Sequence, residues 1–379
     1  MKRPRGPGRI YTRADQDFEA KVLSTSFNAR NPKRIPNILV EANSVEDVQK
    51  AVTQAVRAGL KVNICSGGHS WAQNHLQNEG MLISLARLNS VEIHADQRLA
   101  MVGPGCWGID LDKALRKHRL FFPIAHAPDV CMGGFLLQGG FGWGSRELGI
   151  ATESVIGFDA VLPNGELVYA SETEHSDLFW AARGSGPGFC AVIVRYHLRL
   201  HPRFKFTGIK IQVFQERDLE SVYRWADEIG PEVPRAVEFQ LLLTPKAMGI
   251  FRPGIEVVAP VLTDSWRSAR RAVSFIDRSP IKSKASFTTP LLPLSTPMMS
   301  TVANVTHFPP KVKWCADNMW TNAPIDALIP GIKRIADTMP PAPSHALWLN
   351  WYPPGQRQDM AFSLEANRYL AVYGMWRDD

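Results

Sequence analysis

The sequence is poor in cysteine and lacks the long apolar runs that a membrane span requires. Only 5 of its 379 residues are cysteines (Cys65, Cys106, Cys131, Cys190 and Cys315), and none form a C-x-x-C pair. Scattered cysteines without matching histidines argue against a zinc site and a disulfide framework, so we expect mostly buried free thiols in a reducing compartment. No apolar stretch follows the basic N-terminus and no run approaches the length of a membrane span. We therefore predict a cytoplasmic protein without a signal peptide or membrane contact.

The excess of positive charge is small for a chain of this length. The 43 basic and 36 acidic residues give a net charge of +7 and a pI near 9.2. A nucleic-acid-binding protein would gather lysine, arginine and aromatic residues on one face, and this sequence does not, so we expect no nucleic-acid partner. A mild positive balance suits an anionic cofactor or substrate. The length, with 45% hydrophobic residues, predicts two domains.

A strand–helix–strand unit is predicted between residues 38 and 65. Ser44 and Asp47 have the spacing of a capping box, and they follow a short apolar strand at residues 38–40. The second strand, at residues 62–65, continues directly into Ser66-Gly67-Gly68-His69-Ser70. Two adjacent glycines let the backbone approach a ligand, and ligands of open α/β sheets bind at this end of the strands. An ordinary turn with a surface histidine is the alternative interpretation of these five residues.

Residues 129–149 form the most glycine-dense stretch of the sequence. They contain Gly133, Gly134, Gly139, Gly140, Gly142 and Gly144, interleaved with phenylalanine, leucine and tryptophan. A flexible linker would combine glycine with serine, whereas glycine with large apolar residues indicates backbone packed against a large, partly apolar ligand such as a dinucleotide. A close-packed glycine turn between a helix and a sheet is the alternative. A hairpin is predicted shortly afterwards at Asn164-Gly165.

After residue 203, glycines become few and prolines many. Strands are predicted at residues 207–214, 237–244, 255–262, 346–351 and 369–375, with helices at residues 219–229, 265–276 and 325–338. We therefore predict a tail with a first helix (residues 1–30), an α/β domain (31–203), and an α+β domain with an antiparallel sheet (204–379). Glu238 and Gln240 share one face of an apolar strand, which makes them candidates for a catalytic base and its orienting group. Solvent-facing positions are the alternative for both.

The ordered motifs between residues 25 and 203 resemble FAD-linked oxidases of the vanillyl-alcohol-oxidase (PCMH) type, in the berberine-bridge-enzyme-like branch. These motifs are SGGHS at residues 66–70, Leu88-Asn89, GGFGW-x-SR at 139–146, Pro163-Asn164-Gly165, and DLFWA-x-RG at 177–184. The resemblance implies an α+β fold, in which a two-part α/β FAD-binding domain precedes the substrate domain. It also implies an FAD-dependent oxidoreductase that takes a hydride from a small-molecule alcohol, sugar or amine, with dioxygen as electron acceptor.

The resemblance further implies where FAD binds. His69 would be covalently attached to the 8α-methyl carbon of FAD, since a neutral imidazole is a nucleophile near neutral pH. The other implied FAD-binding residues are Ser66, Gly67, Gly68, Ser70, Leu76, Pro104, Gly105, Asp129, Val130, Gly133, Gly134, Leu137, Gly139, Gly140, Gly142, Trp143 and Val194. Ala127 stands where many relatives have a second linking cysteine, so we expect a single covalent link through His69. Cys131 is the less favoured substitute for that cysteine.

The last residues of the sequence depart from the family pattern. In the family, a segment after the substrate domain completes the FAD domain, and residues 373–379 resemble the strand before that segment. We therefore expect a chain that lacks the return segment. Two alternatives follow: an inactive FAD-binding protein, and an FAD dehydrogenase that uses another acceptor. The expected partners are a small-molecule substrate and dioxygen, and a homo-oligomer is left open.

Overall fold

The computed structural model describes residues 8–249 and 252–378, so part of the predicted N-terminal tail lies outside the described residues. The chain divides into two compact units. Unit 1 contains Met1–Gly142, Ile150–Arg203 and Gln358–Ser363, and unit 2 contains Trp143–Gly149, Phe204–Arg357 and Leu364–Asp379. Both units combine helices with sheets, which confirms the predicted α+β class. Within the described ranges, no helix is long and apolar enough to cross a membrane.

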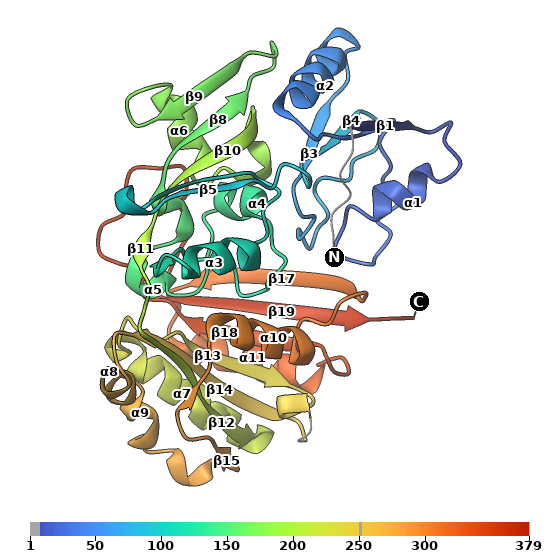
Figure 1. Ribbon diagram of the computed structural model, residues 1–379. Coiled ribbons are helices and arrows are strands. Elements are labelled where there is room, and N and C mark those ends of the chain that lie inside the picture. Colours follow the sequence, from blue (N-terminus) through green and yellow to red (C-terminus); the bar gives the residue numbers. More distant parts are fainter. Residues whose placement is uncertain (1–7, 250–251, 379) are drawn as a thin grey trace. The chain divides into compact units, whose positions relative to one another are not determined.

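The first sheet of unit 1 contains the predicted strand–helix–strand unit (Figure 1). Its strand order is β1 (Arg9–Thr12), β2 (Ile38–Glu41), β4 (Met81–Ser84) and β3 (Val62–Cys65), parallel except for β1. Helix α2 (Val45–Arg57) connects β2 to β3 and begins with the predicted capping box of Ser44 and Asp47. Helix α2 packs on one face of the sheet, and the short helix α1 (Phe18–Leu23) packs on the other.

The second sheet of unit 1 is antiparallel. Its strand order is β5 (Val91–His94), β6 (Leu99–Val102), β10 (Val192–Arg199), β8 (Val155–Val161) and β9 (Leu167–Ser171). The predicted hairpin at Asn164-Gly165 joins β8 to β9, and Gly165 has the positive φ of 85° that favours glycine there. The remaining helices and strands of unit 1 are α3 (Gly108–Arg116), β7 (Leu120–Phe121), α4 (Met132–Leu137), α6 (Ser176–Ala182) and β11 (His201–Pro202).

Unit 2 is built on one eight-stranded antiparallel sheet. The strand order is β15 (Phe287–Thr288), β12 (Phe206–Gln215), β14 (Gly254–Thr263), β13 (Phe239–Thr244), β18 (His345–Asn350), β19 (Arg368–Trp376) and β17 (Lys313–Thr321), with β16 (Leu292–Pro293) also paired to β12. Its helices are α5 (Ser145–Leu148), α7 (Leu219–Ile229), α8 (Trp266–Ala272), α9 (Ser274–Asp277), α10 (Thr296–Thr306) and α11 (Ile325–Asp337). The predicted strands and helices of this region are found, whereas β17 and α10 were not predicted.

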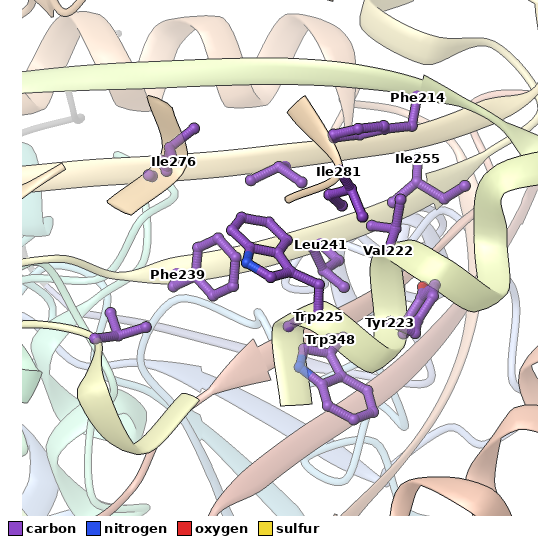
Figure 2. Close-up of a cluster of buried hydrophobic side chains, with 14 of the residues drawn as sticks. Phe214, Val222, Tyr223, Trp225, Phe239, Leu241, Ile255, Ile276, Ile281 and Trp348 are labelled. Atoms are coloured by element: carbon purple, nitrogen blue, oxygen red, sulfur yellow. The ribbon is translucent and has the colours of Figure 1, made fainter. Parts of the chain in front are cut away.

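One face of this sheet carries the hydrophobic core of unit 2 (Figure 2). Trp225 from α7 packs edge-on against Phe239 from β13, and Tyr223 packs edge-on against Trp348 from β18. Side chains alternate along a strand, so the residues next to Phe239 and Trp348 point to the opposite face. The two faces of the sheet are therefore chemically different, and the second face carries the predicted Glu238 and Gln240.

Candidate functional site

The turn after β3 is packed so closely that only glycine fits at two positions. Gly68 has φ 68°, and a Cβ there would collide with the backbone carbonyl oxygen of Thr25. A Cβ at Gly67 would lie 2.7 Å from Cys131 Sγ. Both approaches are shorter than real Cβ contacts, so packing requires glycine at both positions, and the positive φ of Gly68 favours glycine there as well.

His69 follows these glycines and is held on two sides. Its ring stacks on the ring of Phe27, with centroids 4.3 Å apart and an interplanar angle of 19°. Its Nε2 lies 3.3 Å from Asp129 Oδ1. Burial alone would raise the pKa of Asp129, but the hydrogen bond and the charge of His69 lower that pKa below its usual value. The structure thus brings together His69 and Asp129, which are 60 residues apart in the sequence.

The second glycine segment lies against the first. A Cβ at Gly133 would lie 3.0 Å from Ser66 Cβ and 2.9 Å from Pro104 Cβ, so these three predicted residues meet at one point. The Gly133 amide donates to the Pro104 carbonyl oxygen (2.9 Å), and Tyr196 Oη donates to the Gly133 carbonyl oxygen (3.0 Å). Gly133, Gly134 and Leu137 belong to the short helix α4.

The other predicted FAD-binding residues do not all lie in one environment, and one of them belongs to unit 2. Leu76 and Val194 are buried in its hydrophobic cores. Gly139 and Gly140 have φ values of 99° and 79°, and both fall in the turn after α4. Trp143 belongs to unit 2, where its indole Nε1 donates to Ser300 Oγ (3.2 Å). The assignment of all these residues to FAD stays a prediction.

The cysteines near the glycine turn are buried. Cys131 is 3% exposed, and its thiol contacts the Gly105 carbonyl oxygen at 3.4 Å. Burial, together with the nearby Cys131, raises the pKa of Cys65 to about 12, so Cys65 stays a protonated thiol. A protonated, buried thiol is a poor nucleophile, which leaves His69 as the strongest candidate for a covalent link in this turn.

In unit 2, Glu238 and Gln240 lie together on the sheet face opposite the core. Glu238 is 5% exposed, and its Oε1 accepts a hydrogen bond from the Gly144 amide (2.9 Å). Its Oε2 lies 3.5 Å from Gln240 Nε2. The carboxylate therefore also holds the segment Trp143–Gly149, which directly follows the glycine-rich stretch in the sequence.

Arg146 also anchors this segment to the rest of unit 2. Its buried guanidinium donates to the backbone carbonyl oxygens of Val233, Pro234, Val237 and Trp351. Burial lowers the pKa of Arg146 to about 10, and it stays charged at neutral pH. Four carbonyl oxygens satisfy this buried cation through its planar fork of donors. Arg146 is part of the GGFGW-x-SR motif, but the motif alone does not predict that its guanidinium binds these carbonyl oxygens.

Aromatic side chains extend the face that carries Gln240. In the sheet register Gln240 is opposite Leu349, Leu349 is opposite Tyr369, and Tyr369 is opposite Trp320. The rings of Tyr369 and Trp320 have centroids 5.0 Å apart. The sequence predicts the strand that contains Tyr369 but not its place beside Leu349 and Trp320, because the alternation of one strand does not show which strands lie next to it.

Two tyrosines of β19 are joined on this face. Tyr373 donates a hydrogen bond to Tyr369, and burial raises the pKa of both side chains. The Tyr373 ring lies 4.9 Å from that of His345, whose pKa burial lowers to about 3. The face therefore presents aromatic and hydrogen-bonding groups together with two buried carboxylates, Glu238 near Gln240 and Glu256 beside His307.

Comparisons with known proteins agree with these features. Residues 36–171 match a family model described as an FAD binding domain. An FAD-linked oxidoreductase of Penicillium ochrochloron is 31% identical over 363 residues, covering 94% of this chain and 78% of that protein. A xylooligosaccharide oxidase of Thermothelomyces thermophilus is 36% identical over 184 residues, covering 48% of this chain and 37% of that protein. The solved structure of a berberine-bridge-enzyme-like protein of Physcomitrella patens has TM-score 0.81 at 19% identity, covering 98% of this chain and 82% of that chain.

Proposed function

We propose that this chain, which belongs to the FAD-linked oxidoreductases, oxidises a small-molecule alcohol, sugar or amine while passing electrons to dioxygen. It is an FAD-dependent oxidoreductase. The observation that carries the proposal is the glycine turn that presents His69 beside Asp129. Two glycines that tolerate no Cβ hold this turn tightly against its neighbours, and a glycine turn lets backbone approach an anionic dinucleotide closely.

The residues of unit 1 fit FAD. Gly67 and Gly68 keep side chains out of the turn after β3, which we propose to bind the pyrophosphate, and Gly133, whose amide donates to the Pro104 carbonyl oxygen, lies against that turn. Bound FAD supplies the hydride acceptor of the reaction. His69 is the residue that we propose to form the single covalent link, since Ala127 replaces the cysteine of the second link and the Cys131 thiol is buried.

Substrate recognition is assigned to the polar face of the unit 2 sheet. Glu238 is the proposed base that accepts a proton from the substrate, and Gln240 is the group that orients its carboxylate. The Tyr369 and Trp320 rings provide an apolar surface against which a sugar ring or an aromatic amine can pack. The Tyr369 hydroxyl, which accepts a hydrogen bond from the buried Tyr373, adds a polar group at a fixed position beside that surface.

Dioxygen is the proposed acceptor because a relative at 36% identity is named an oxidase. Product formation by an oxidase consumes dioxygen and releases hydrogen peroxide, whereas a dehydrogenase would need a different acceptor. The two reactions are therefore distinguished by one assay. The same assay decides between an active enzyme and a protein that only binds FAD.

The test uses the purified chain of residues 1–379. Acid precipitation should leave yellow flavin in the pellet, and His69→Ala should release all of it to the supernatant. A panel of alcohols, sugars and amines is then screened for flavin bleaching without oxygen and for peroxide formation in air. Bleaching with peroxide formation supports the proposal; bleaching without peroxide shows a dehydrogenase. Bound flavin that no member of the panel reduces would argue against catalysis of this substrate class.

A further inference from the structure

The imidazole of His69 is fixed in both plane and direction. The stack on Phe27 sets the plane of the ring, and the contact of Nε2 with Asp129 sets its rotation within that plane. Among the described residues, the structure gives Nδ1 no hydrogen-bond partner. One nitrogen is therefore engaged by a carboxylate, and the other keeps its lone pair for a ligand.

The Phe27 side of this arrangement is held by buried hydrogen bonds. Gln73, which is 2% exposed, donates from Nε2 to Ser26 Oγ (2.9 Å), the Asn28 carbonyl oxygen (3.2 Å) and the Arg30 carbonyl oxygen (2.9 Å). The Phe27 amide donates to the Gly68 carbonyl oxygen at 3.0 Å. Phe27 and His69 thus belong to two loops that are joined both through backbone and through Gln73.

The Asp129 side is equally fixed. The carbonyl oxygens on either side of it, those of Pro128 and Val130, accept hydrogen bonds from the amides of Ile109 (3.1 Å) and Gly108 (2.9 Å). These amides belong to the first turn of α3, so the backbone at Asp129 is tied to a helix. Its carboxylate is presented to His69 from a backbone that the packing of unit 1 determines.

We propose that Asp129 is the positioning residue for covalent flavin attachment, and that it directs the bond to Nδ1 of His69. This inference rests on the proposed function. A carboxylate that accepts the Nε2 proton holds the imidazole in the tautomer whose lone pair is on Nδ1, and it stabilises the positive ring that forms when Nδ1 is alkylated.

Covalent attachment is a two-electron oxidation, and dioxygen is its oxidant. A bond forms between His69 Nδ1 and the 8α carbon of the cofactor, while one proton leaves that carbon and the electron pair of its C–H bond passes into the flavin ring. Dioxygen then accepts two electrons and two protons and leaves as hydrogen peroxide, which restores the oxidised ring. The second proton comes from the imidazolium Nε2, beside Asp129.

The central experiment uses the chain of residues 1–379, made in a riboflavin-starved host and then mixed with FAD, and compares the rates of covalent attachment. In Asp129→Asn the attachment rate should fall by about 100-fold, the scale typical of losing one positioned proton acceptor, while non-covalent FAD still binds. Asp129→Glu should restore part of the rate. Glu92→Gln is the matched control, because Glu92 pairs with His94 at 3.1 Å elsewhere in unit 1 and should leave the rate unchanged.

The second measurement identifies the alkylated nitrogen by NMR of the flavin peptide, which a purely structural role of Asp129 would not influence. Attachment at Nδ1 supports the inference; attachment at Nε2 overturns it. Asp129→Asn that attaches FAD at the wild-type rate, or that no longer binds FAD at all, also overturns the positioning role. If the wild-type protein releases all its flavin in acid, the His69 link of the proposed function is wrong, and this inference falls with it.

Discussion

The glycine turn of unit 1 and the polar sheet face of unit 2 are two different kinds of site. The turn is made by backbone, since Gly67 and Gly68 matter through the side chains that they lack. The sheet face is made by side chains, such as Glu238 and Tyr369, that project from strands of ordinary composition. A site built of backbone restricts the residue type at each position, whereas a sheet face accepts many residue types.

This difference explains why the sequence predicts candidate residues for binding the cofactor but does not identify the substrate. FAD is common to the family, so the turn that would bind it carries a residue pattern that a single sequence displays. The substrate differs between family members, and the sheet face carries no fixed pattern. Substitutions in the two regions should therefore have different consequences, and three of them test the comparison.

The largest effect is expected for Gly68→Ala. The alanine would have to adopt the left-handed backbone conformation of Gly68, and its Cβ would collide with the Thr25 carbonyl oxygen. We expect the two effects together to lower the free energy of unfolding by about 3 kcal/mol. The protein should also lose its flavin. Urea unfolding and acid-stable flavin content measure the two effects.

Gly59→Ala is the matched control for this prediction. Gly59 has φ 64°, close to that of Gly68, but no heavy atom lies within 4 Å of the Cβ position. Gly59→Ala should cost only about 1 kcal/mol for the left-handed backbone and should keep the flavin. Equal effects of the two substitutions would show that backbone conformation, not close packing, is what the turn requires.

The second prediction concerns the anchoring of Trp143–Gly149 in unit 2. Arg146→Met would leave four buried carbonyl oxygens without their shared donor, so we expect a loss of about 3 kcal/mol in the free energy of unfolding. Arg224→Met is the control, since exposed Arg224 pairs only at the surface with Glu220 and Asp326 and should leave the unfolding midpoint nearly unchanged. A similar midpoint for both variants would contradict the anchoring role.

Much of the fold could be predicted because local rules determine it. The capping box of Ser44 and Asp47 and the hairpin at Asn164-Gly165 are short-range signals, and both are confirmed. Strand β17 was missed because it pairs on one side only and its residues Asp317, Asn318 and Met319 are exposed, so the apolar alternation of a half-buried strand is absent. The exchange of Trp143–Gly149 and Gln358–Ser363 between units depends on tertiary contacts that local patterns do not contain.

The candidate site divides in the same way. The sequence predicted the glycine turn, His69 and the second glycine segment, but not that Asp129 reaches His69 or that Phe27 stacks on it. Both contacts join residues that are more than 40 positions apart, and no spacing rule relates such residues. Gln240 could be placed on a face of its strand, but its row of neighbours through Leu349 to Tyr369 required the register of the sheet.

The smallest effect on stability, with a clear effect on rate, is expected for Glu238→Gln. Glutamine keeps an oxygen that can accept the Gly144 hydrogen bond, so the fold and the flavin content should be retained. The charge needed to accept a substrate proton is lost, so the turnover rate with a substrate found in the panel should fall by about 100-fold. Peroxide formation under saturating substrate measures it.

Glu256→Gln gives this last prediction its control. Glu256 lies on the same sheet face, is 2% exposed, and accepts a hydrogen bond from the Met248 amide (2.7 Å), much as Glu238 does from Gly144. If burial and an amide contact were all that mattered, the two variants would behave alike. If turnover falls in Glu238→Gln and persists in Glu256→Gln, the result supports Glu238 as the base. Turnover that persists in both reduces Glu238 to an anchor for Gly144 and directs the search to the Tyr369 and Tyr373 pair.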